Sequence, residues 1–199
     1  FTQNPGNMLK DIFLELLKRY SADTILATKL WNEIEAAYTT SKRHYHSLAH
    51  LENLLAQLSS VKQHIQDWDT LLFTLFYHDI IYNTLKQDNE EKSAELAVER
   101  LQSLAYPADK TTKCKAQILA TKSHELSTDN DTNLFTDADL SILGADWDTY
   151  LQYCKNVRRE YSIYPDLLYK PGRRKAMQHF LDMEYIFKTA QFREKYEEQ

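Results

Sequence analysis

The distribution of glycine and proline constrains the fold of this chain more than any other feature of its sequence. The 199 residues contain only three glycines and four prolines, and neither residue occurs between Gly6 and Pro107. Tight β-hairpins need glycine or an Asn-Gly pair at positive φ, so this long stretch cannot readily form a series of them. Helices joined by short polar turns fit it better, and the sequence predicts an all-α fold.

Apolar residues recur at helical spacing along most of the chain, with polar turns between the segments that show it. One hydrophobic core fits a chain of this length, so we expect a single domain over residues 1–199. A polar loop is expected at 125–132, and a proline-interrupted link runs up to Pro171. The expected helices cover residues 8–20, about 24–38, about 45–58, 71–82, about 89–104, about 109–124 and about 147–161, with a last helical region from Gly172.

Composition limits the classes of partner. The net charge of −5 gives no electrostatic reason to expect binding to a nucleic acid duplex. No apolar run approaches the roughly 20 residues of a membrane span, and the start of the chain lacks a signal-peptide pattern. Cys114 and Cys154 form no CxxC pair and indicate no disulfide framework. We therefore expect a cytoplasmic protein without a membrane partner; the oligomeric state stays open, with a homodimer among the options.

Two polar residues interrupt the most apolar segment. Residues 71–82 are apolar on every side at helical spacing, which indicates a buried helix, yet His78 and Asp79 lie side by side within it. An ionised carboxylate buried without partners costs many kcal/mol, so it is kept only when it is paired or bound to a metal. A hydrogen-bonded pair and a metal site are both compatible with this helix alone.

Other polar residues can complete a metal site. His46 and His50 are four residues apart, so on a helix both imidazoles project from one face, although a solvated or core histidine pair has the same spacing. Asp139 runs into an apolar segment and, taken alone, could be a helix cap. Together, two imidazoles and two carboxylates form a mixed set of metal ligands, from His50, His78, Asp79 and Asp139.

Such a set leaves positions open on an octahedral ion. Mixed nitrogen and oxygen ligands suit Mn, Fe, Co, Ni or Zn better than Mg, although Mg is not excluded. A bound divalent ion would lower the pKa of its water from 15.7 towards ~7 and supply a hydroxide nucleophile near neutral pH.

The order of these motifs resembles that of the HD superfamily of metal-dependent phosphohydrolases, and more narrowly a bacterial family of small predicted HD-domain phosphohydrolases. The resemblance covers about residues 41–175. It implies a single all-α HD domain, with a metal ion on the four residues above and hydrolysis of a small phosphorylated substrate, a nucleotide being one option. The matching motifs are Arg43-x-Tyr45-His46-x-x-x-His50, His78-Asp79, Asn89-Glu90-Glu91-x-Ser93-Ala94, Thr121-Lys122-x-His124, Asp139-Leu140-x-Ile142-Leu143-Gly144, Arg158-x-Glu160-Tyr161 and Gly172-Arg173.

The resemblance also implies roles for individual residues. In related cyclic-nucleotide phosphodiesterases, the first histidine of a Tyr-His-Asn-x-x-His run donates a proton to the leaving oxygen; here Ser47 replaces the asparagine. An imidazole with a pKa near 6.5 suits that task, so His46 is expected to be catalytic or to contact phosphate. The expected catalytic residues are His46, Asp79 and, as a base behind the metal ligands, Glu90. The residues expected to contact an anionic substrate are Arg43, Lys122, His124 and Arg173, although solvated surface charge explains each cation equally well.

Two other functions fit parts of the pattern. Some HD proteins hold two irons and oxidise with O₂, which requires further His or Asp ligands, and here His124 is the one evident candidate. A second alternative is a regulatory module that binds a nucleotide without cleaving it. We expect a hydrolase, because His46 is predicted to lie one helical turn from a metal ligand, where a proton donor is needed and a sensor has no use for one.

Overall fold

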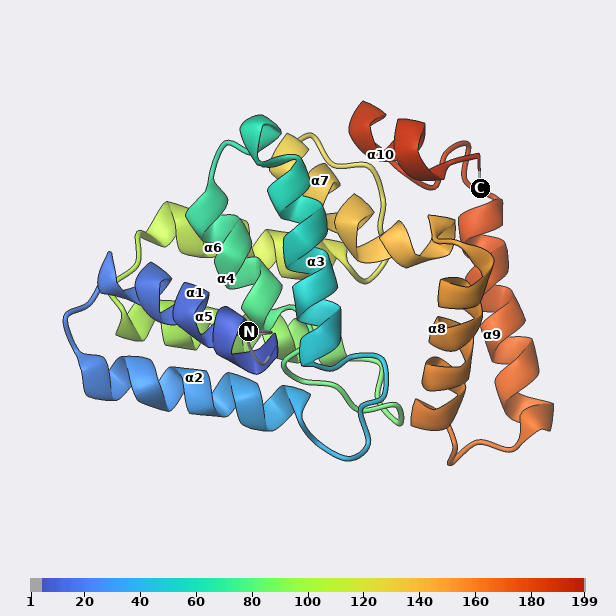
Figure 1. The fold of residues 1–199 in the computed structure, drawn as a ribbon, viewed down its shortest axis with the longest axis horizontal. Coiled ribbons are helices and arrows are strands. Elements are labelled where there is room, and N and C mark those ends of the chain that lie inside the picture. Colours follow the sequence, from blue (N-terminus) through green and yellow to red (C-terminus); the bar gives the residue numbers. More distant parts are fainter. Residues whose placement is uncertain (1–4, 199) are drawn as a thin grey trace.

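The chain folds into helices joined by short connections. The computed structural model describes residues 5–198, and over that range the chain contains ten α-helices, two short 3₁₀ helices and no β-strand (Figure 1). The predicted all-α fold is therefore confirmed. None of the helices in residues 5–198 combines the length and the apolar character that a membrane crossing requires. In chain order the elements are α1 (Pro5–Lys18), α2 (Thr24–Tyr38), α3 (Leu48–Ser60), η1 (Lys62–His64), α4 (Trp68–Tyr77), α5 (Asn89–Ser103), α6 (Ala108–Ala120), α7 (Asn130–Leu140), η2 (Ser141–Gly144), α8 (Trp147–Glu160), α9 (Asp166–Leu181) and α10 (Ala190–Tyr196).

Aspartates determine where four of the helices begin. Each accepts a hydrogen bond from a backbone N–H in the first turn, which satisfies a donor that the helix itself leaves unpaired. At the starts of α4, α7 and α8, a threonine three residues after the aspartate also donates its hydroxyl to that aspartate, at 2.6–2.8 Å. Such a cap stabilises a helix by about 1 kcal/mol. The caps of α2, α4, α7 and α8 are Asp23, Asp67, Asp129 and Asp146.

The core is built around α4, in which residues 70–77 are all buried. This helix packs against α3, α5 and α6, while α1 packs on α2 and α3. Aromatic rings fill the space between α1 and α4, where Phe13 meets Phe76 edge-on with 4.9 Å between the ring centroids. The predicted buried helix is present, but it ends earlier than expected, so His78 and Asp79 follow its last turn.

The helix predicted for residues 45–58 also begins late, because the backbone ahead of it is held elsewhere. It starts three residues later than predicted, and the backbone N–H groups of the residues just before it donate to the carboxylate of Glu160. The prediction that His46 and His50 share one helix face is therefore wrong. His46 lies in the turn before α3, and His50 lies in the first turn of that helix.

Three other boundaries differ from the prediction. The helix expected to reach His124 stops four residues earlier, and His124 itself adopts a left-handed backbone (φ 53°). The loop predicted at 125–132 is shorter, because Asp129 caps α7. The link predicted up to Pro171 is the first part of α9. Proline leaves the carbonyl of Leu167 without its helical donor, and Leu167 is 84% exposed, so solvent can satisfy that carbonyl.

Helices α8 and α9 form an antiparallel hairpin at one side of the molecule (Figure 1). Arg173 of α9 donates a hydrogen bond of 2.7 Å to the hydroxyl of Tyr153 in α8. Helix α9 contains no buried residue, and α8 buries only Val157 and Glu160. The hairpin therefore packs on one side of the helical core and contributes little to it.

The C-terminal segment is held by a buried carboxylate and by a glycine. Just before α10, the backbone N–H groups of Lys188 and Thr189 donate to Asp137 at 2.7–3.0 Å. A Cβ atom added at Gly144 would lie 2.5 Å from Cβ of Tyr196 in α10, which is closer than side chains tolerate. Gly144 thus permits the close approach of η2 and α10.

We expect Gly144→Ala to destabilise the protein, because α10 has to move away from η2 to admit the methyl group. The expected loss is on the order of 1–3 kcal/mol in the free energy of unfolding, measured by urea denaturation. Gly172→Ala is the matched control: a Cβ there meets no atom within 4 Å. Alanine favours a helix, so this variant should gain roughly 0.5–1 kcal/mol. Equal stability changes in the two variants would contradict the close approach.

Candidate metal centre

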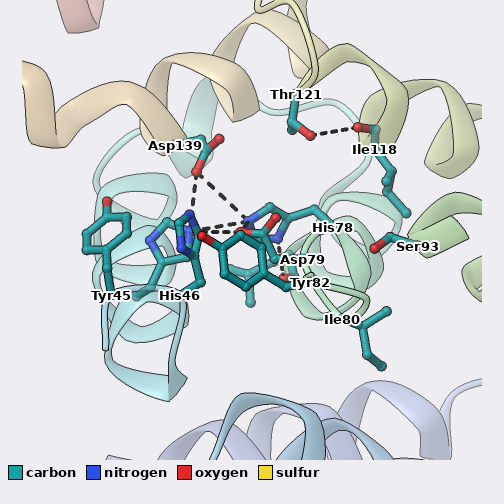
Figure 2. A network of polar contacts seen from close by, with 12 residues as sticks. Tyr45, His46, His78, Asp79, Ile80, Tyr82, Ser93, Ile118, Thr121 and Asp139 are labelled. Carbon is teal, nitrogen blue, oxygen red and sulfur yellow. Dashed lines mark hydrogen bonds and ion pairs between the residues drawn. The ribbon is translucent and has the colours of Figure 1, made fainter. Parts of the chain in front are cut away.

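Two histidines and an aspartate meet where α3, α4 and α7 come together. His50 and His78 are buried (5% and 1% exposed), and their Nε2 atoms lie 3.3 Å apart. Asp139, near the end of α7, places Oδ1 3.3 Å from Nε2 of His50 and 3.9 Å from Nε2 of His78. The ligand atoms of these three residues all lie within 4.8 Å of one another, so the group can hold a metal ion. Figure 2 shows the contacts of His78 and Asp139 within this cluster.

The orientation of His78 leaves its inner nitrogen free to bind a cation. Its Nδ1 lies 2.9 Å from the carbonyl oxygen of Leu75, which can only accept, so in the neutral imidazole Nδ1 carries the proton and Nε2 has the lone pair. Carboxylate oxygens of Asp79 and Asp139 lie near that Nε2, as does the second imidazole. Lone pairs that converge in a buried site need a cation among them, either protons or a metal ion. The residues therefore fit a metal ion with mixed nitrogen and oxygen ligands.

Asp79 joins the cluster from the position after His78. Its Oδ2 lies 3.1 Å from Nε2 of His78 and 3.8 Å from Nε2 of His50. It is not one of the three residues whose ligand atoms all lie within 4.8 Å of one another. The structure thus brings together all four residues selected from the sequence, with His50, His78 and Asp139 as the tightest group.

The carboxylates and imidazoles stabilise each other's charged forms. Burial works against the cationic form of His78, but Asp79 and Asp139 outweigh it and raise the pKa of His78 to about 9. Burial also disfavours ionised carboxyl groups, yet the neighbouring histidines hold the pKa values of Asp79 and Asp139 well below their usual range. At neutral pH both carboxylates are therefore ionised, and a metal ion that binds His78 displaces its proton.

A second buried carboxylate holds His46 beside the cluster. The side chain of Glu160 is 0% exposed. Its Oε1 accepts the backbone N–H groups of His44, Tyr45 and His46 at 2.7–2.9 Å, and its Oε2 lies 2.7 Å from Nδ1 of His46 and 2.9 Å from the hydroxyl of Tyr82. Burial opposes ionisation, but these donors lower the pKa of Glu160 to about 2. Burial also lowers the pKa of His46, and the hydrogen bond to Glu160 leads the contributions that raise it overall.

Asp79 and Asp139 line a cavity of about 660 Å³, a size that suits a small organic molecule. One part of its wall is charged or polar, and another part is aromatic. His50 and His78 are not among the lining residues and lie behind the carboxylates. The charged or polar part includes His46, Lys86, Glu90, Lys122, His124 and Arg173, and the aromatic part consists of Tyr82, Tyr153, Tyr161, Tyr164 and Tyr169.

Three of the residues expected to contact substrate line this cavity, and they differ in their contacts. Lys122 pairs with a glutamate of α5. Nε2 of His124 lies 2.9 Å from Oδ2 of Asp139 and therefore adjoins the metal-ligand group. Arg173 donates to the hydroxyl of Tyr153, and it has no carboxylate partner among residues 5–198. Arg173 is thus the member of this set that keeps donors for an anion.

Arg43, expected to contact substrate, and Glu90, expected to act as a base, differ in whether they reach the cavity. Arg43 does not line the cavity: its guanidinium donates to the carbonyl oxygens of Asp79 and Ile80 at 2.7 and 2.8 Å and lies over the ring of Tyr38. These hydrogen bonds hold the backbone at residues 79–80, just after α4. Glu90 does line the cavity, and burial raises its pKa.

Glu160 and Tyr82 were not expected to have a role. One signal for Glu160 was present in the sequence, because it falls three positions after Val157 and both belong to the narrow buried face of α8. A carboxylate on such a face indicates a buried partner. Tyr82 carries no comparable signal, and only the structure brings it beside His46, with 4.3 Å between the two ring centroids (Figure 2).

Protein loaded with Mn, Co or Zn should retain about one ion per chain, measured by elemental analysis after removal of free metal. Asp139→Asn keeps the shape of the side chain but removes its charge, and we expect it to weaken metal binding by about 10- to 100-fold or more. His78→Ala should abolish binding. His64→Ala is the matched control, since His64 is exposed and remote from the cluster. Equal affinity in the wild type and His78→Ala would contradict the site.

Comparison of the chain with protein-family models, with curated proteins and with solved structures gives no match in any of the three. The features that indicate a function are therefore the metal-ligand group, the cavity and the residues around His46.

Proposed function

We propose that the protein is a metal-dependent phosphohydrolase that cleaves a small phosphorylated substrate. The observation that carries this proposal is the position of the metal-ligand group beside a cavity that also contains Lys122 and Arg173. A phosphate group is recognised by cations with several hydrogen-bond donors, and an ion on Asp139 would add to them. The resemblance of the ordered motifs to HD phosphohydrolases supports the same activity.

We propose a divalent transition metal as the cofactor. Imidazole and carboxylate ligands together suit Mn, Fe, Co, Ni or Zn, whereas Mg prefers oxygen ligands alone. Such an ion, when bound, supplies a Lewis acid and lowers the pKa of water at the site. His50, His78 and Asp139 would hold it, with Asp79 beside them.

Arg173 is the proposed anchor for the phosphate group. Its guanidinium lies 5.0 Å from the ring centroid of Tyr153 and donates to the hydroxyl of the same residue, which fixes its position in the cavity wall. Because no carboxylate of residues 5–198 pairs with it, its remaining N–H groups are available to a phosphate oxygen. Lys122 is already paired with a glutamate and is the weaker candidate.

His46 is the proposed proton donor to the leaving oxygen. Glu160 accepts the Nδ1 proton of His46, so a second proton is carried by Nε2 and can be given away. The raised pKa of His46 favours this doubly protonated form near neutral pH, which is the form that a general acid needs. Glu160 acts through His46 and is therefore a positioning residue. Glu90 is a further candidate for proton transfer, because burial raises its pKa.

The two alternative functions have less support. A di-iron oxygenase needs a second set of ligands, and within residues 5–198 there is one group of three or more close ligands. His124, bonded to Asp139, is the one additional ligand at hand. A nucleotide sensor has no use for a protonated histidine fixed beside the metal ligands, and His46 is held there by a buried carboxylate.

We expect hydrolysis of at least one compound in a screen of phosphomonoesters, phosphodiesters and nucleotides, measured as release of inorganic phosphate or, for a phosphodiester, of a phosphomonoester. The activity should require added Mn, Co, Ni or Mg, should stop with EDTA, and should be lost in Asp139→Asn. Tight nucleotide binding without turnover in the same screen would favour the sensor instead. Oxygen consumption by iron-loaded protein would favour the oxygenase.

We expect His46→Ala to keep its metal and to lose rate by about 10²–10⁴ on substrates with poor leaving groups. The loss should be smaller on nitrophenyl phosphates, because a good leaving group needs little protonation. Equal losses on good and poor leaving groups would assign His46 to binding.

Glu160→Gln tests the same proton donor through its partner. The hydrogen bond that Glu160 accepts from His46 raises the pKa of His46, so the pH above which activity falls should move to lower pH in this variant. The carboxylate of Glu160 also stabilises the fold above its usual pKa, on the order of 3 kcal/mol at neutral pH, and this contribution is lost as pH falls towards 2. The difference in unfolding free energy between wild type and variant should therefore shrink in acid.

A further inference from the structure

The hairpin of α8 and α9 gives the cavity an aromatic wall. Four tyrosines of this hairpin line the cavity together with Leu168. Two of them, Tyr161 and Tyr169, have ring centroids 5.9 Å apart and ring planes inclined at 48°, so the two rings are neighbours in the wall. The four tyrosines are Tyr153, Tyr161, Tyr164 and Tyr169.

Contacts within the protein hold these rings in place. The hydroxyl of Tyr164 donates to the carbonyl oxygen of Thr84 at 3.1 Å, and the hydroxyl of Tyr153 accepts from Arg173. The guanidinium of Arg158 lies 4.6 Å from the ring centroid of Tyr169. With two hydroxyls engaged within the protein, the wall offers mainly ring surface to a ligand rather than hydrogen bonds.

These tyrosines are not needed to fill a core. Helix α9 has no buried residue, and Tyr161, Tyr164 and Tyr169 are only partly buried. Aromatic side chains that stay accessible in a cavity suit a flat, apolar partner, because stacking removes ring surface of both partners from water.

We infer that the substrate is a phosphate ester of an alcohol that carries a planar ring, and that this ring lies against Tyr161 and Tyr169. The inference rests on the proposed function, because it places the phosphate between Arg173 and the metal-ligand group. The cavity, at about 660 Å³, holds a phosphate and a ring system together.

With the substrate placed in this way, the reaction is hydrolysis of the phosphate ester. The oxygen of water bonds to phosphorus, and the bond between phosphorus and the alcohol oxygen breaks. The alcohol leaves with the proton given by His46, and inorganic phosphate remains. One proton of the water stays on the phosphate, and the other is released to solvent and is equivalent to the proton that His46 takes up again before the next cycle. The ring takes no part in bond breaking; it contributes binding and orientation.

The test uses the metal-loaded protein and two matched pairs of esters. Benzyl and ethyl phosphate both release a simple alkyl alcohol, and adenosine 5′-monophosphate and ribose 5-phosphate release the same primary alcohol oxygen, so the ring is the main difference within each pair. We expect kcat/KM to be at least ~10-fold higher for the member with the ring, since one stacked ring is worth roughly 5- to 150-fold in binding. A preference confined to the adenosine pair identifies a nucleobase as the ring, and a preference in both pairs identifies any planar ring.

Variants locate the ring. Tyr161→Leu and Tyr169→Leu should each reduce the preference several-fold, whereas Tyr161→Phe and Tyr169→Phe keep the ring surface and should retain it. Tyr185→Leu is the matched control, because Tyr185 lies outside the cavity and is 46% exposed. Retention of the full preference in both leucine variants would overturn the inference.

Binding without turnover separates this inference from the proposed function. Calorimetry with benzylphosphonate and methylphosphonate needs no hydrolysis, and the benzyl compound should bind about 10-fold more tightly. If all four esters are hydrolysed at equal efficiency, the ring inference is wrong and the hydrolase stands. If none is hydrolysed but the benzyl compound binds preferentially and the leucine variants lose that preference, the ring site stands and the hydrolase is wrong.

Discussion

The burial of carboxylates is the physical constraint on which this structure depends. An ionised carboxylate removed from water costs several kcal/mol unless donors or cations replace its hydration. Asp131, Asp137 and Glu160 solve this with backbone N–H groups, each accepting at least two of them. Asp79 and Asp139 accept no backbone N–H from the described residues and face imidazoles instead. Asp131 and Asp137 also pair with Lys113 and Lys188. The contrast therefore separates acids that are bonded to the backbone from the two acids that face imidazoles alone and can share a metal ion with them.

Glu160 links the two parts of the candidate site. It belongs to α8, but its donors lie in the turn before α3, 114–116 residues away in the sequence. The same carboxylate that stops this turn from becoming helix also binds Nδ1 of His46 and the hydroxyl of Tyr82. The position of the proposed proton donor therefore depends on the docking of the hairpin, even though the metal ligands come from other helices.

What could be predicted from the sequence follows from how local the determinants are. The all-α fold depends on apolar spacing and on the rarity of glycine and proline, and both are visible in short windows. His78 and Asp79 were identifiable because burying a polar residue in an apolar segment costs free energy in any fold unless that residue has a partner. Glu160 was assigned no role and Arg43 was assigned a different one. Arg43 donates to backbone carbonyl groups, and three of the donors to Glu160 are backbone N–H groups; every residue carries such groups and no sequence pattern marks them. The other two donors to Glu160, His46 and Tyr82, are far from it in the sequence.

The two walls of the cavity are subject to different constraints. On one side, Asp79 and Asp139 line the cavity, and His50 and His78 lie behind them where α3, α4 and α7 meet. Changes there disturb helices that also form the core. Another part of the wall lies on the hairpin, where α9 has no fully buried residue and five of its residues line the cavity. Phe180, near the end of α9, is partly buried and packs against the core. Substitutions on α9 therefore cost little stability, so this wall can change with the ligand while the metal-ligand group stays fixed. Such a division lets the same metal ligands and proton donor act on substrates with different organic groups. Selectivity for the organic group then depends on α9, the helix that has no fully buried residue.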